Sequence, residues 1–475
     1  MMNIPEGFKR RMINILGAEE AEKLFFSIEN EDAVKAFRVN AIKTDIDSFE
    51  AAKPQIDRQK ADFPSYAYIT REEYPGSLPC HHSGAIYVQD ISAMSTVTAT
   101  EIREVAIILD SCSAPGGKTT QLAAAAGKSG IVVANEYDKK RCRILQGNVE
   151  RMGAANTVVC NLDTAVLAEL YPALFDLVLC DAPCSGEGMF RKNARAVEEW
   201  SEENVKMCAE RQREILTNVA KCVKVGGRLL YSTCTFALDE NEENVAWFLN
   251  THKDFSLVPV TEELKNHTSD GIMLEDCDID MTLCRRIYPH RSRGEGQFIA
   301  LFERSADVEV SQNAKKDKKD KRAKSGDAPK KSRQELETID TAKKFLEENL
   351  SSIPSGELIM LGGFVYLAPK IKLPEYNVFT AGVCIGECQK GRMIPHHQLF
   401  SALGREFARK VILSGSDEEA RRYLAGEEIG VEGLVSSDGK NGNGWAAVLI
   451  DGCAVGGVKI SGGVAKNHYP KGLRN

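Results

Sequence analysis

Short apolar runs rich in β-branched residues alternate with longer amphipathic stretches between residues 105 and 234. This alternation is typical of βαβ units around a parallel sheet. We expect five buried strands, at VAIILD (105–110), GIVVANE (130–136), NTVVC (156–160), FDLVLCD (175–181) and GRLLYSTC (227–234). Helical periodicity in KKRCRILQGNVERMG and ENVKMCAERQREILTNVAKCV predicts two long helices, each followed by a glycine stop signal. The fold class is therefore α/β, with a Rossmann-like central domain.

Changes in composition and in the pattern of apolar residues along the chain predict four segments. Residues 1–95, with a helical stretch near 18–26 and the string AFRVNAIK, form a small α+β lead domain, and residues 96–304 form the α/β domain. Its last apolar runs, TLCRRIYP and QFIALF, are close enough to pair as a hairpin. Residues 305–335 are Lys-rich and nearly free of large apolar side chains, which predicts a disordered linker. Residues 336–475, with many glycines between apolar runs, predict a mostly β domain.

Composition narrows the class of protein. A chain of 475 residues needs more than one core, and 43% hydrophobic with 27% charged residues is typical of soluble globular proteins. The start MMNIPEGFKRRM lacks the apolar segment of a signal peptide, no run is long enough to predict a membrane helix, and the 14 cysteines lack a disulfide pattern. We therefore expect a cytoplasmic protein with reduced thiols and no membrane partner. The net charge of -7 leaves room for local basic patches. Nothing in the sequence predicts an oligomeric state.

A glycine-rich turn follows the first predicted strand. In DSCSAPGGKT (110–119), Gly116 and Gly117 allow a ligand to approach the backbone where a helix begins. Cys112 occupies the place of the first P-loop glycine, which argues against a nucleoside triphosphatase. Glu136 lies 20 residues beyond Gly116, at the end of the next strand, a spacing that suits the hydroxyl pair of a ribose. Asp163, after the third strand, is a candidate for the adenine amino group. NAD and S-adenosylmethionine both fit this pattern.

Two cysteines and an aspartate follow the fourth and fifth predicted strands. DAPCSGEGMFRK places Asp181 and Cys184 at the ligand edge of an open parallel sheet, and YSTCT places Cys234 nearby. Cys180 and Cys222 are better read as small core residues. The spacing of the cysteines does not match a zinc site, so we expect no metal.

A thiol beside a carboxyl group suits methyl transfer to carbon 5 of cytosine. That carbon is a poor nucleophile until a thiolate adds at carbon 6. Asp181 would stabilise charge on the ring through hydrogen bonds at N3 and the exocyclic amine, with the neutral acid as a candidate form. Lys118 and Arg191 are candidates to favour the thiolate. Position alone leaves open which of Cys184 and Cys234 attacks.

These motifs, with AFRVN (36–40), HHSGAIYVQDISAM (81–94) and KNHYPKGLR (466–474), occur in one order along nearly the whole chain. The chain resembles the NOL/NOP/Sun (Fmu) RNA cytosine-5 methyltransferases, and in particular their bacterial RsmF-like subgroup. Two departures are CSAPGG in place of the commoner CAAPGG, and Thr-Ala after Asp163 where relatives often have Gly-Arg.

The resemblance implies a role for each motif. The S-adenosylmethionine site would consist of Cys112, Ser113, Ala114, Pro115, Gly116, Gly117, Lys118, Glu136, Asp163 and Asp181. Cys234 would attack cytosine and Cys184 would assist product release. The substrate would be small-subunit (16S) ribosomal RNA or the small ribosomal subunit, and the C-terminal domain would be PUA-like and bind RNA.

Candidate RNA contacts and two other functions complete the predictions. Tyr87, Phe190, Arg191 and the tail KNHYPKGLR combine aromatic and cationic groups that suit an unstacked base and RNA. One alternative is a DNA cytosine-5 methyltransferase that uses Cys184, although no target-recognition insert is evident and DNA is not the expected partner. The other is a non-catalytic RNA-binding factor for ribosome assembly.

Overall fold

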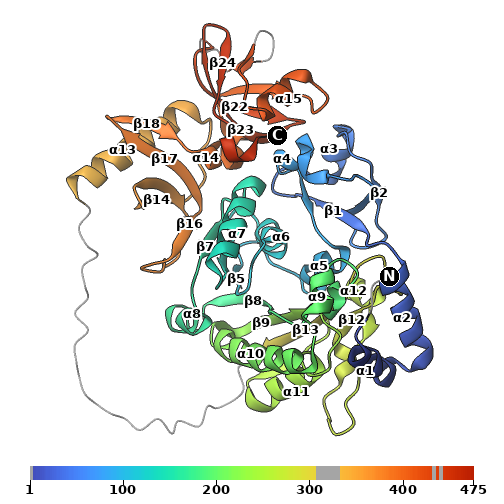
Figure 1. Ribbon diagram of the computed structural model, residues 1–475. Coiled ribbons are helices and arrows are strands. Elements are labelled where there is room, and N and C mark those ends of the chain that lie inside the picture. Colours follow the sequence, from blue (N-terminus) through green and yellow to red (C-terminus); the bar gives the residue numbers. More distant parts are fainter. Residues whose placement is uncertain (1–3, 306–331, 431–434, 438–441, 475) are drawn as a thin grey trace, which may run out of the picture.

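The computed structural model describes residues 4–305, 332–430, 435–437 and 442–474 (Figure 1). Its largest sheet has five parallel strands at the centre, in the order β9-β8-β5-β6-β7. They are the five predicted strands, β5 (Ile107–Asp110), β6 (Ile131–Asn135), β7 (Thr157–Cys160), β8 (Phe175–Asp181) and β9 (Val223–Thr233). Because the chain order reverses beside β5, a ligand crevice is expected at the carboxyl ends of β5, β6 and β8.

Antiparallel strands extend this sheet on both sides. On one side the predicted hairpin is confirmed, since β13 pairs with β9 and β12 pairs with β13. The strands on that side are β10 (Phe255–Leu257), β11 (Ser269–Asp270), β12 (Arg285–Ile287) and β13 (Gln297–Arg304). On the other side β16 (Val378–Ala381), from the C-terminal third of the chain, pairs with β7.

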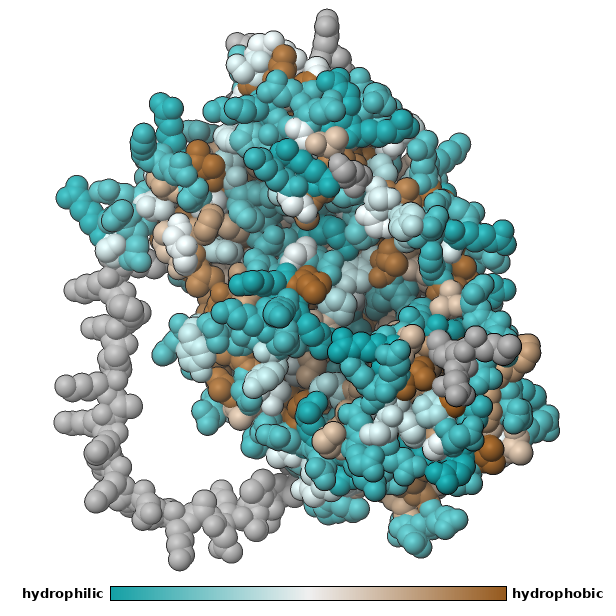
Figure 2. All heavy atoms as spheres, in the orientation of Figure 1, coloured by the Kyte–Doolittle hydropathy of each residue, from teal (hydrophilic) through white to brown (hydrophobic). Residues whose placement is uncertain are grey.

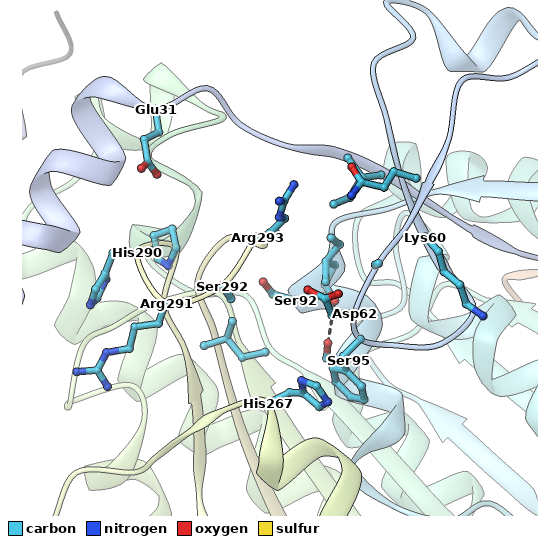
Figure 3. Close-up of a pocket in the computed structure, with 17 residues that line it drawn as sticks. Glu31, Lys60, Asp62, Ser92, Ser95, His267, His290, Arg291, Ser292 and Arg293 are labelled. Atoms are coloured by element: carbon cyan, nitrogen blue, oxygen red, sulfur yellow. Dashed lines mark hydrogen bonds between the residues drawn. The ribbon is translucent and has the colours of Figure 1, made fainter.

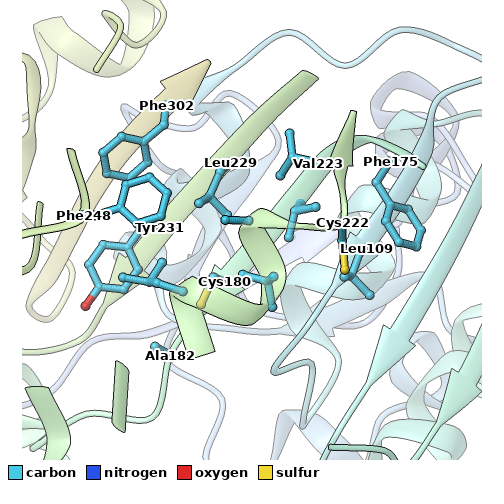
Figure 4. Packing of buried hydrophobic residues seen from close by; sticks show 14 of the residues in the cluster. Leu109, Phe175, Cys180, Ala182, Cys222, Val223, Leu229, Tyr231, Phe248 and Phe302 are labelled. Atoms are coloured by element: carbon cyan, nitrogen blue, oxygen red, sulfur yellow. The ribbon is translucent and has the colours of Figure 1, made fainter. Parts of the chain in front are cut away.

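Helices cover both faces because alternate residues of the strands point to opposite sides. Leu109 and Val178 belong to a cluster that packs under one set of helices, part of which is drawn in Figure 4. Ile108 and Leu179 belong to a second cluster on the opposite face. The first set is α8 (Thr164–Leu170), α10 (Glu202–Ala220) and α11 (Glu242–Thr251), and the second is α6 (Gly117–Ala125), α7 (Lys139–Met152) and α12 (Glu262–Asn266).

The two predicted long helices end differently. α7 ends at Gly153 in the left-handed conformation, with φ of 73°, as the glycine stop predicts. α10 ends at Ala220, and Lys221 keeps right-handed dihedral angles, so the predicted glycine stop is wrong there. The chain enters β9 at Val223, so this turn needs no left-handed residue.

The N-terminal part packs a small antiparallel sheet and two helices against the central domain. Its strands pair in the order β2-β3-β1-β4. The elements are α1 (Glu6–Leu16), α2 (Ala18–Asn30), β1 (Lys35–Val39), α3 (Ile46–Ala51), β2 (Gln59–Lys60), β3 (Ala67–Thr70), α4 (Pro79–His82), β4 (Ile86–Val88) and α5 (Ile91–Ser95). A short segment separates α5 from β5, near the predicted domain boundary.

The C-terminal part contains two further sheets. One has the order β14-β15-β17-β18 and the other β20-β24-β23-β22-β19-β21. The first set of elements is α13 (Arg333–Asn349), β14 (Glu357–Leu361), β15 (Phe364–Ala368), β17 (Val383–Gln389), β18 (Arg392–Pro395) and α14 (His397–Leu403). The second is β19 (Arg409–Leu413), α15 (Glu418–Leu424), β20 (Ile429–Gly430), β21 (Val435–Ser437), β22 (Gly444–Ile450), β23 (Cys453–Ser461) and β24 (Val464–Asn467).

The predicted linker of residues 305–335 lies mostly outside the described residues. Ser332 caps α13 with a capping box, so the predicted domain start at residue 336 falls inside a helix. Among the helices that the structure describes, none is long and apolar enough to cross a membrane. The face shown in Figure 2 is mostly hydrophilic and is hollowed near its centre.

Candidate active site

The glycine-rich turn lies at the carboxyl end of β5. Gly116 adopts φ of 108°, a conformation that favours glycine, and α6 begins at Gly117. No side chain caps the first turn of α6, so its backbone N–H groups are available to an anionic ligand. A Cβ atom at position 117 would come within 3.0 Å of the Gln89 side chain, so Gln89 would have to shift.

Glu136 holds this turn against the end of β6. Its carboxylate accepts hydrogen bonds from the backbone N–H of Ala114 at 3.3 Å and of Asp138 at 2.9 Å. The side chain is only 7% exposed. Ser113 donates to the carbonyl of Asp110 at 2.7 Å, which tightens the same turn. Sequence position thus located Glu136 at the crevice, and the structure adds that it orders the loop.

Cys112 and Asp163 complete the predicted cofactor residues. A hydrogen bond with Cys180 and burial raise the pKa of Cys112 well above its usual value, so this thiol stays neutral. Asp163 is exposed at the start of α8 and accepts a hydrogen bond from Ala165 N at 2.8 Å. Asn161, which was not predicted, donates to the carbonyl of Glu136 at 2.7 Å and joins the ends of β6 and β7.

Cys184 and Cys234 lie together, as the strand-end argument predicts. Their sulfur atoms are 3.3 Å apart, and both side chains are partly accessible. The hydrogen bond to Cys234 and burial raise the pKa of Cys184 well above its usual value. The two sulfurs share this contact, in which either thiol could be the donor.

Asp181 is oriented by two neighbours. Lys118 Nζ lies 2.7 Å from Oδ2, and Ser232 Oγ donates to Oδ1 at 2.6 Å. The two contacts hold the side chain of Asp181 in one orientation. Lys118 is thus a partner of Asp181, and Ser232 is a site residue that the motifs did not identify.

Two buried glutamates connect the loops that carry the cysteines. Glu240, on the loop after Cys234, accepts hydrogen bonds from Ser185 N at 3.0 Å and Ser185 Oγ at 2.5 Å. Glu187, on the loop after Cys184, accepts hydrogen bonds from Thr235 Oγ1 and from Phe236 N, each at 3.0 Å. We call this pair the glutamate clamp. Each loop supplies the carboxylate that binds the other, so the clamp fixes the distance between the loops.

Three predicted RNA contacts are wrong. Phe190 is fully buried and packs 5.1 Å from the ring of Phe8. Tyr87 is 5% exposed and lies beneath the guanidinium of Arg38, 5.1 Å away. The Arg191 side chain is 4% exposed and pairs with Glu295 at 3.1 Å, so it is not placed to favour a thiolate. All three side chains connect the N-terminal part or a neighbouring loop to the central domain.

The C-terminal motif KNHYPKGLR also packs inward at its aromatic residue. Tyr469 is 2% exposed, and its hydroxyl lies 2.8 Å from Nδ1 of His82. The ring that was predicted to contact RNA instead contacts the N-terminal part. Contacts between domains bury these side chains. Patterns in a single sequence do not reveal such contacts.

Comparison with known proteins gives consistent matches along the chain. Residues 97–303 match the family model of the 16S rRNA methyltransferases RsmB/F. Residues 4–91 match the N-terminal domain of 16S rRNA methyltransferase RsmF, and residues 410–475 match the RsmF PUA domain. A ribosomal RNA small subunit methyltransferase F from Vibrio campbellii is 29% identical, over 99% of this chain and 97% of that protein. The relative of that name from Pectobacterium carotovorum is 30% identical over 64% of each chain.

Solved structures share the fold of the central domain. A methyltransferase homologue from Pyrococcus horikoshii covers 64% of this chain and 96% of its own, with a TM-score of 0.55 and 26% identity. NSun6 from the same organism has a TM-score of 0.55 at 22% identity, covers 64% of this chain and 100% of its own, and shows the fold alone. Three models of one family match in order, and the full-length relatives carry the corresponding name. The chain therefore belongs to the RsmB/F family of methyltransferases, in its RsmF branch, as the motifs predicted.

Proposed function

We propose that this chain methylates carbon 5 of cytosine in small-subunit ribosomal RNA, through a covalent bond between Cys234 and the base. Family membership supports methylation of ribosomal RNA. The observation that supports the covalent route is the pair of cysteine sulfurs at 3.3 Å, with Asp181 on the strand beside Cys234. A protein with 14 cysteines and no disulfide among the described residues suits a reducing cytoplasm.

The cofactor is S-adenosylmethionine, and the residues at the strand ends fit it. The uncapped start of α6 suits its carboxylate, and Glu136 at the end of β6 suits its ribose. We assign Cys112 to Lys118, Glu136, Asp163 and Asp181 to this site. When bound, the cofactor supplies an electrophilic methyl group for carbon 5.

Cys234 is the nucleophile in this proposal. Its thiolate forms a bond to carbon 6 of cytosine, and the electron pair of the C5–C6 double bond becomes available at carbon 5. The hydrogen bond to Cys234 and burial raise the pKa of Cys184, which makes Cys184 the weaker candidate for the thiolate.

Asp181 holds the target base. As a carboxylate fixed by Lys118 and Ser232, it accepts a hydrogen bond from the exocyclic amine of cytosine. Lys118 balances the charge of that carboxylate in the crevice. Asp181 in this role orients the ring beside the cysteine sulfurs.

Cys184 assists release of the product. After carbon 5 has received the methyl group, its proton must leave, the C5–C6 double bond must reform and the bond from Cys234 to carbon 6 must break. A thiol 3.3 Å from the Cys234 sulfur lies beside that bond. Cys184 first loses its own proton to water, and its thiolate then takes the carbon 5 proton. The electron pair of that C–H bond reforms the C5–C6 double bond, and Cys234 leaves carbon 6 as a thiolate.

The test compares Cys234→Ala with Cys184→Ala in purified protein, using ribosomal RNA and labelled methyl donor. We expect Cys234→Ala to form no 5-methylcytosine, and Cys184→Ala to accumulate a protein–RNA adduct that denaturing gels retain. Unchanged 5-methylcytosine in Cys234→Ala would falsify the assignment. The reverse pattern, with adducts only in Cys234→Ala, would make Cys184 the nucleophile, as in the DNA alternative. Failure of wild-type protein to methylate any RNA or DNA would leave the assembly-factor alternative.

A further inference from the structure

A cavity of about 500 Å³ lies between the N-terminal part and the loop that precedes β13 (Figure 3). Its wall includes Asp62 and Phe63 from the N-terminal part, Ser92 from α5, His267 after α12, and Arg293. None of these residues belongs to the cofactor site or to the cysteine pair. A cavity of this size is in the range that accommodates a small organic ligand or a nucleotide.

The cavity lies close to Cys234 along a short series of backbone contacts. Gly188 N donates to the carbonyl of Cys234 at 2.9 Å, and Gly296 N donates to the carbonyl of Gly188 at 3.0 Å. Arg293 precedes Gly296 by three residues, which span at most about 11 Å even when fully extended. Ser92 Oγ also donates to the carbonyl of Glu295 at 2.7 Å, which joins the cavity wall to the same loop.

The wall offers a flat stacking surface. The rings of Phe63 and His267 are parallel, with centroids 4.6 Å apart and an interplanar angle of 2°. Phe63 is buried, whereas His267 is exposed, so the outer ring of this stack is available to a third ring. Stacking on aromatic side chains is a common way to hold an unpaired base.

Polar groups without protein partners surround this stack. Arg293 and Asp62 are exposed, and neither has an ion-pair or hydrogen-bond partner among the described residues. Arg291 is instead paired with Glu20 at 2.5 Å. The His290 side chain is 4% exposed, and its Nδ1 atom has no hydrogen-bond partner in the described part of the chain. A ligand with an anionic group, polar edges and a flat ring complements this set.

We propose that this cavity binds a nucleotide of the substrate RNA that flanks the target cytosine, with its base on His267 and its phosphate at Arg293. This inference rests on the proposed function, because it takes Cys234 as the point where the target base is held. Binding of this nucleotide would place the RNA strand between the N-terminal part and the loop before β13. It would thereby keep the target base at the cysteines.

The test measures binding of a single-stranded ribosomal RNA fragment that wild-type protein methylates, over a range of salt concentrations. His267→Ala removes the outer ring, and we expect it to raise the Kd for RNA about tenfold with an unchanged salt dependence. Arg293→Ala removes one phosphate contact, and we expect its slope of log Kd against log salt to fall by about 0.7. Arg103→Ala is the matched control, because Arg103 is an exposed arginine at the opposite, amino-terminal edge of β5.

The affinity for S-adenosylmethionine should stay at the wild-type value in all three variants. If His267→Ala and Arg293→Ala bind RNA like Arg103→Ala while the wild type forms 5-methylcytosine, the cavity assignment is overturned and the proposed function stands. That outcome would indicate that the cavity serves another ligand, such as a protein segment. If the wild type does not methylate RNA at all, the proposed function fails first. A 4-thiouridine placed beside the mapped target should cross-link to the cavity wall, and cross-links confined to other surfaces would also overturn the assignment.

Discussion

At the scale of single residues, Asp181 is oriented by two neighbouring side chains before the target nucleobase binds. Ser232 is fully buried on β9 and donates to one carboxylate oxygen, while Lys118 contacts the other. Two directional contacts leave the carboxylate little freedom to rotate. Preorganised groups of this kind stabilise charge without having to reorient during the reaction.

Ser232→Ala should therefore slow methylation more than it weakens binding. Loss of one orienting hydrogen bond should lower kcat about tenfold, with little change in the affinity for S-adenosylmethionine. Single-turnover rates and equilibrium binding measure the two effects. Ser256→Ala, at an exposed serine of β10, serves as the control. A normal kcat in Ser232→Ala would show that Lys118 alone orients Asp181.

Asp110, at the end of β5 before the glycine-rich turn, makes the folding stability depend on pH. Burial raises the pKa of Asp110 to about 7 from 3.8, and its Oδ1 atom has no partner among the described residues. Because the folded pKa lies above the unfolded value, folding takes up a proton between these two values. This group's contribution to stability is therefore lost as the pH rises toward and through about 7.

Asp110→Asn should flatten that dependence. The amide cannot ionise, and its oxygen can still accept the hydrogen bond from Thr119, which is 2.7 Å long in the wild type. The Tm of the wild type should fall more than that of the variant between about pH 4 and about pH 7. Asp276→Asn, at an exposed aspartate, should behave like the wild type. Equal pH dependence in wild type and Asp110→Asn would mean that Asp110 is ionised throughout.

At the scale of elements, the glutamate clamp positions two strand-end loops. Gln212 of α10 adds a hydrogen bond of 2.8 Å to Glu240, and Trp200 donates to Glu187 at 2.9 Å. Arg11 of α1 lies 3.4 Å from Glu187, so the N-terminal part reaches the clamp. The sulfur pair thus depends on carboxylates outside the cysteine motifs.

Glu240→Ala should disturb the loops and lower stability. It leaves the buried backbone N–H of Ser185 without its acceptor and removes one acceptor each from Ser185 Oγ and Gln212 Nε2, which should cost about 2–4 kcal/mol of unfolding free energy. Glu240→Gln keeps an acceptor and should recover most of that loss. Chemical denaturation measures it, with Glu214→Ala on the exposed face of α10 as the control.

The same variants test the positioning role. If the clamp sets the sulfur spacing, Glu240→Ala should react more slowly than the wild type with a short bifunctional thiol-reactive reagent that cross-links Cys184 to Cys234. Glu214→Ala should react at the wild-type rate. Equal cross-linking in all variants would limit Glu240 to stability alone.

At the scale of the whole molecule, Lys43 joins three parts of the chain. Its side chain is 4% exposed, and Nζ donates to the carbonyl of Ala454 at 2.7 Å and to the carbonyl of Ser401. Ser401 Oγ in turn donates to the carbonyl of Glu150 in α7 at 2.8 Å. The N-terminal part, the central domain and the C-terminal part therefore meet at one lysine.

Lys43→Met should remove a pH-dependent contribution to stability. Burial lowers the pKa of Lys43 from 10.5 to about 7. The unfolded chain then binds more protons between these values, so stability should rise as the pH increases above about 7. Lys43→Met should lose this rise, and it should be about 1–3 kcal/mol less stable because two buried carbonyls lose their donor. Thermal unfolding over this pH range measures both effects, with exposed Lys128→Met as the control. A variant that keeps the rise would place its origin elsewhere.

Local patterns predicted most of the central domain. The five parallel strands and the final hairpin follow from apolar runs and turn signals, which act over a few neighbouring residues. Because parallel strands present their carboxyl ends at one edge, the same patterns brought Cys184, Cys234 and Asp181 to one crevice. These local patterns did not predict the pairing of β16 with β7, because the two strands are far apart in the sequence. Such pairing depends on how domains pack, which periodicity does not encode.

Local sequence patterns were enough to predict the α/β fold, the glycine turn with Glu136, the two candidate thiols and, through the ordered motifs, the family. The distance of 3.3 Å between the sulfurs and the pairing of Lys118 with Asp181 depend on the packing of distant segments. This packing also makes Glu187 and Glu240 buried partners of opposite loops, although glutamates are usually exposed. Tyr87, Phe190 and Tyr469 became core contacts for the same reason. Strand and helix formation follow from local periodicity and turn chemistry, whereas the partner of a side chain is set by residues far away in sequence.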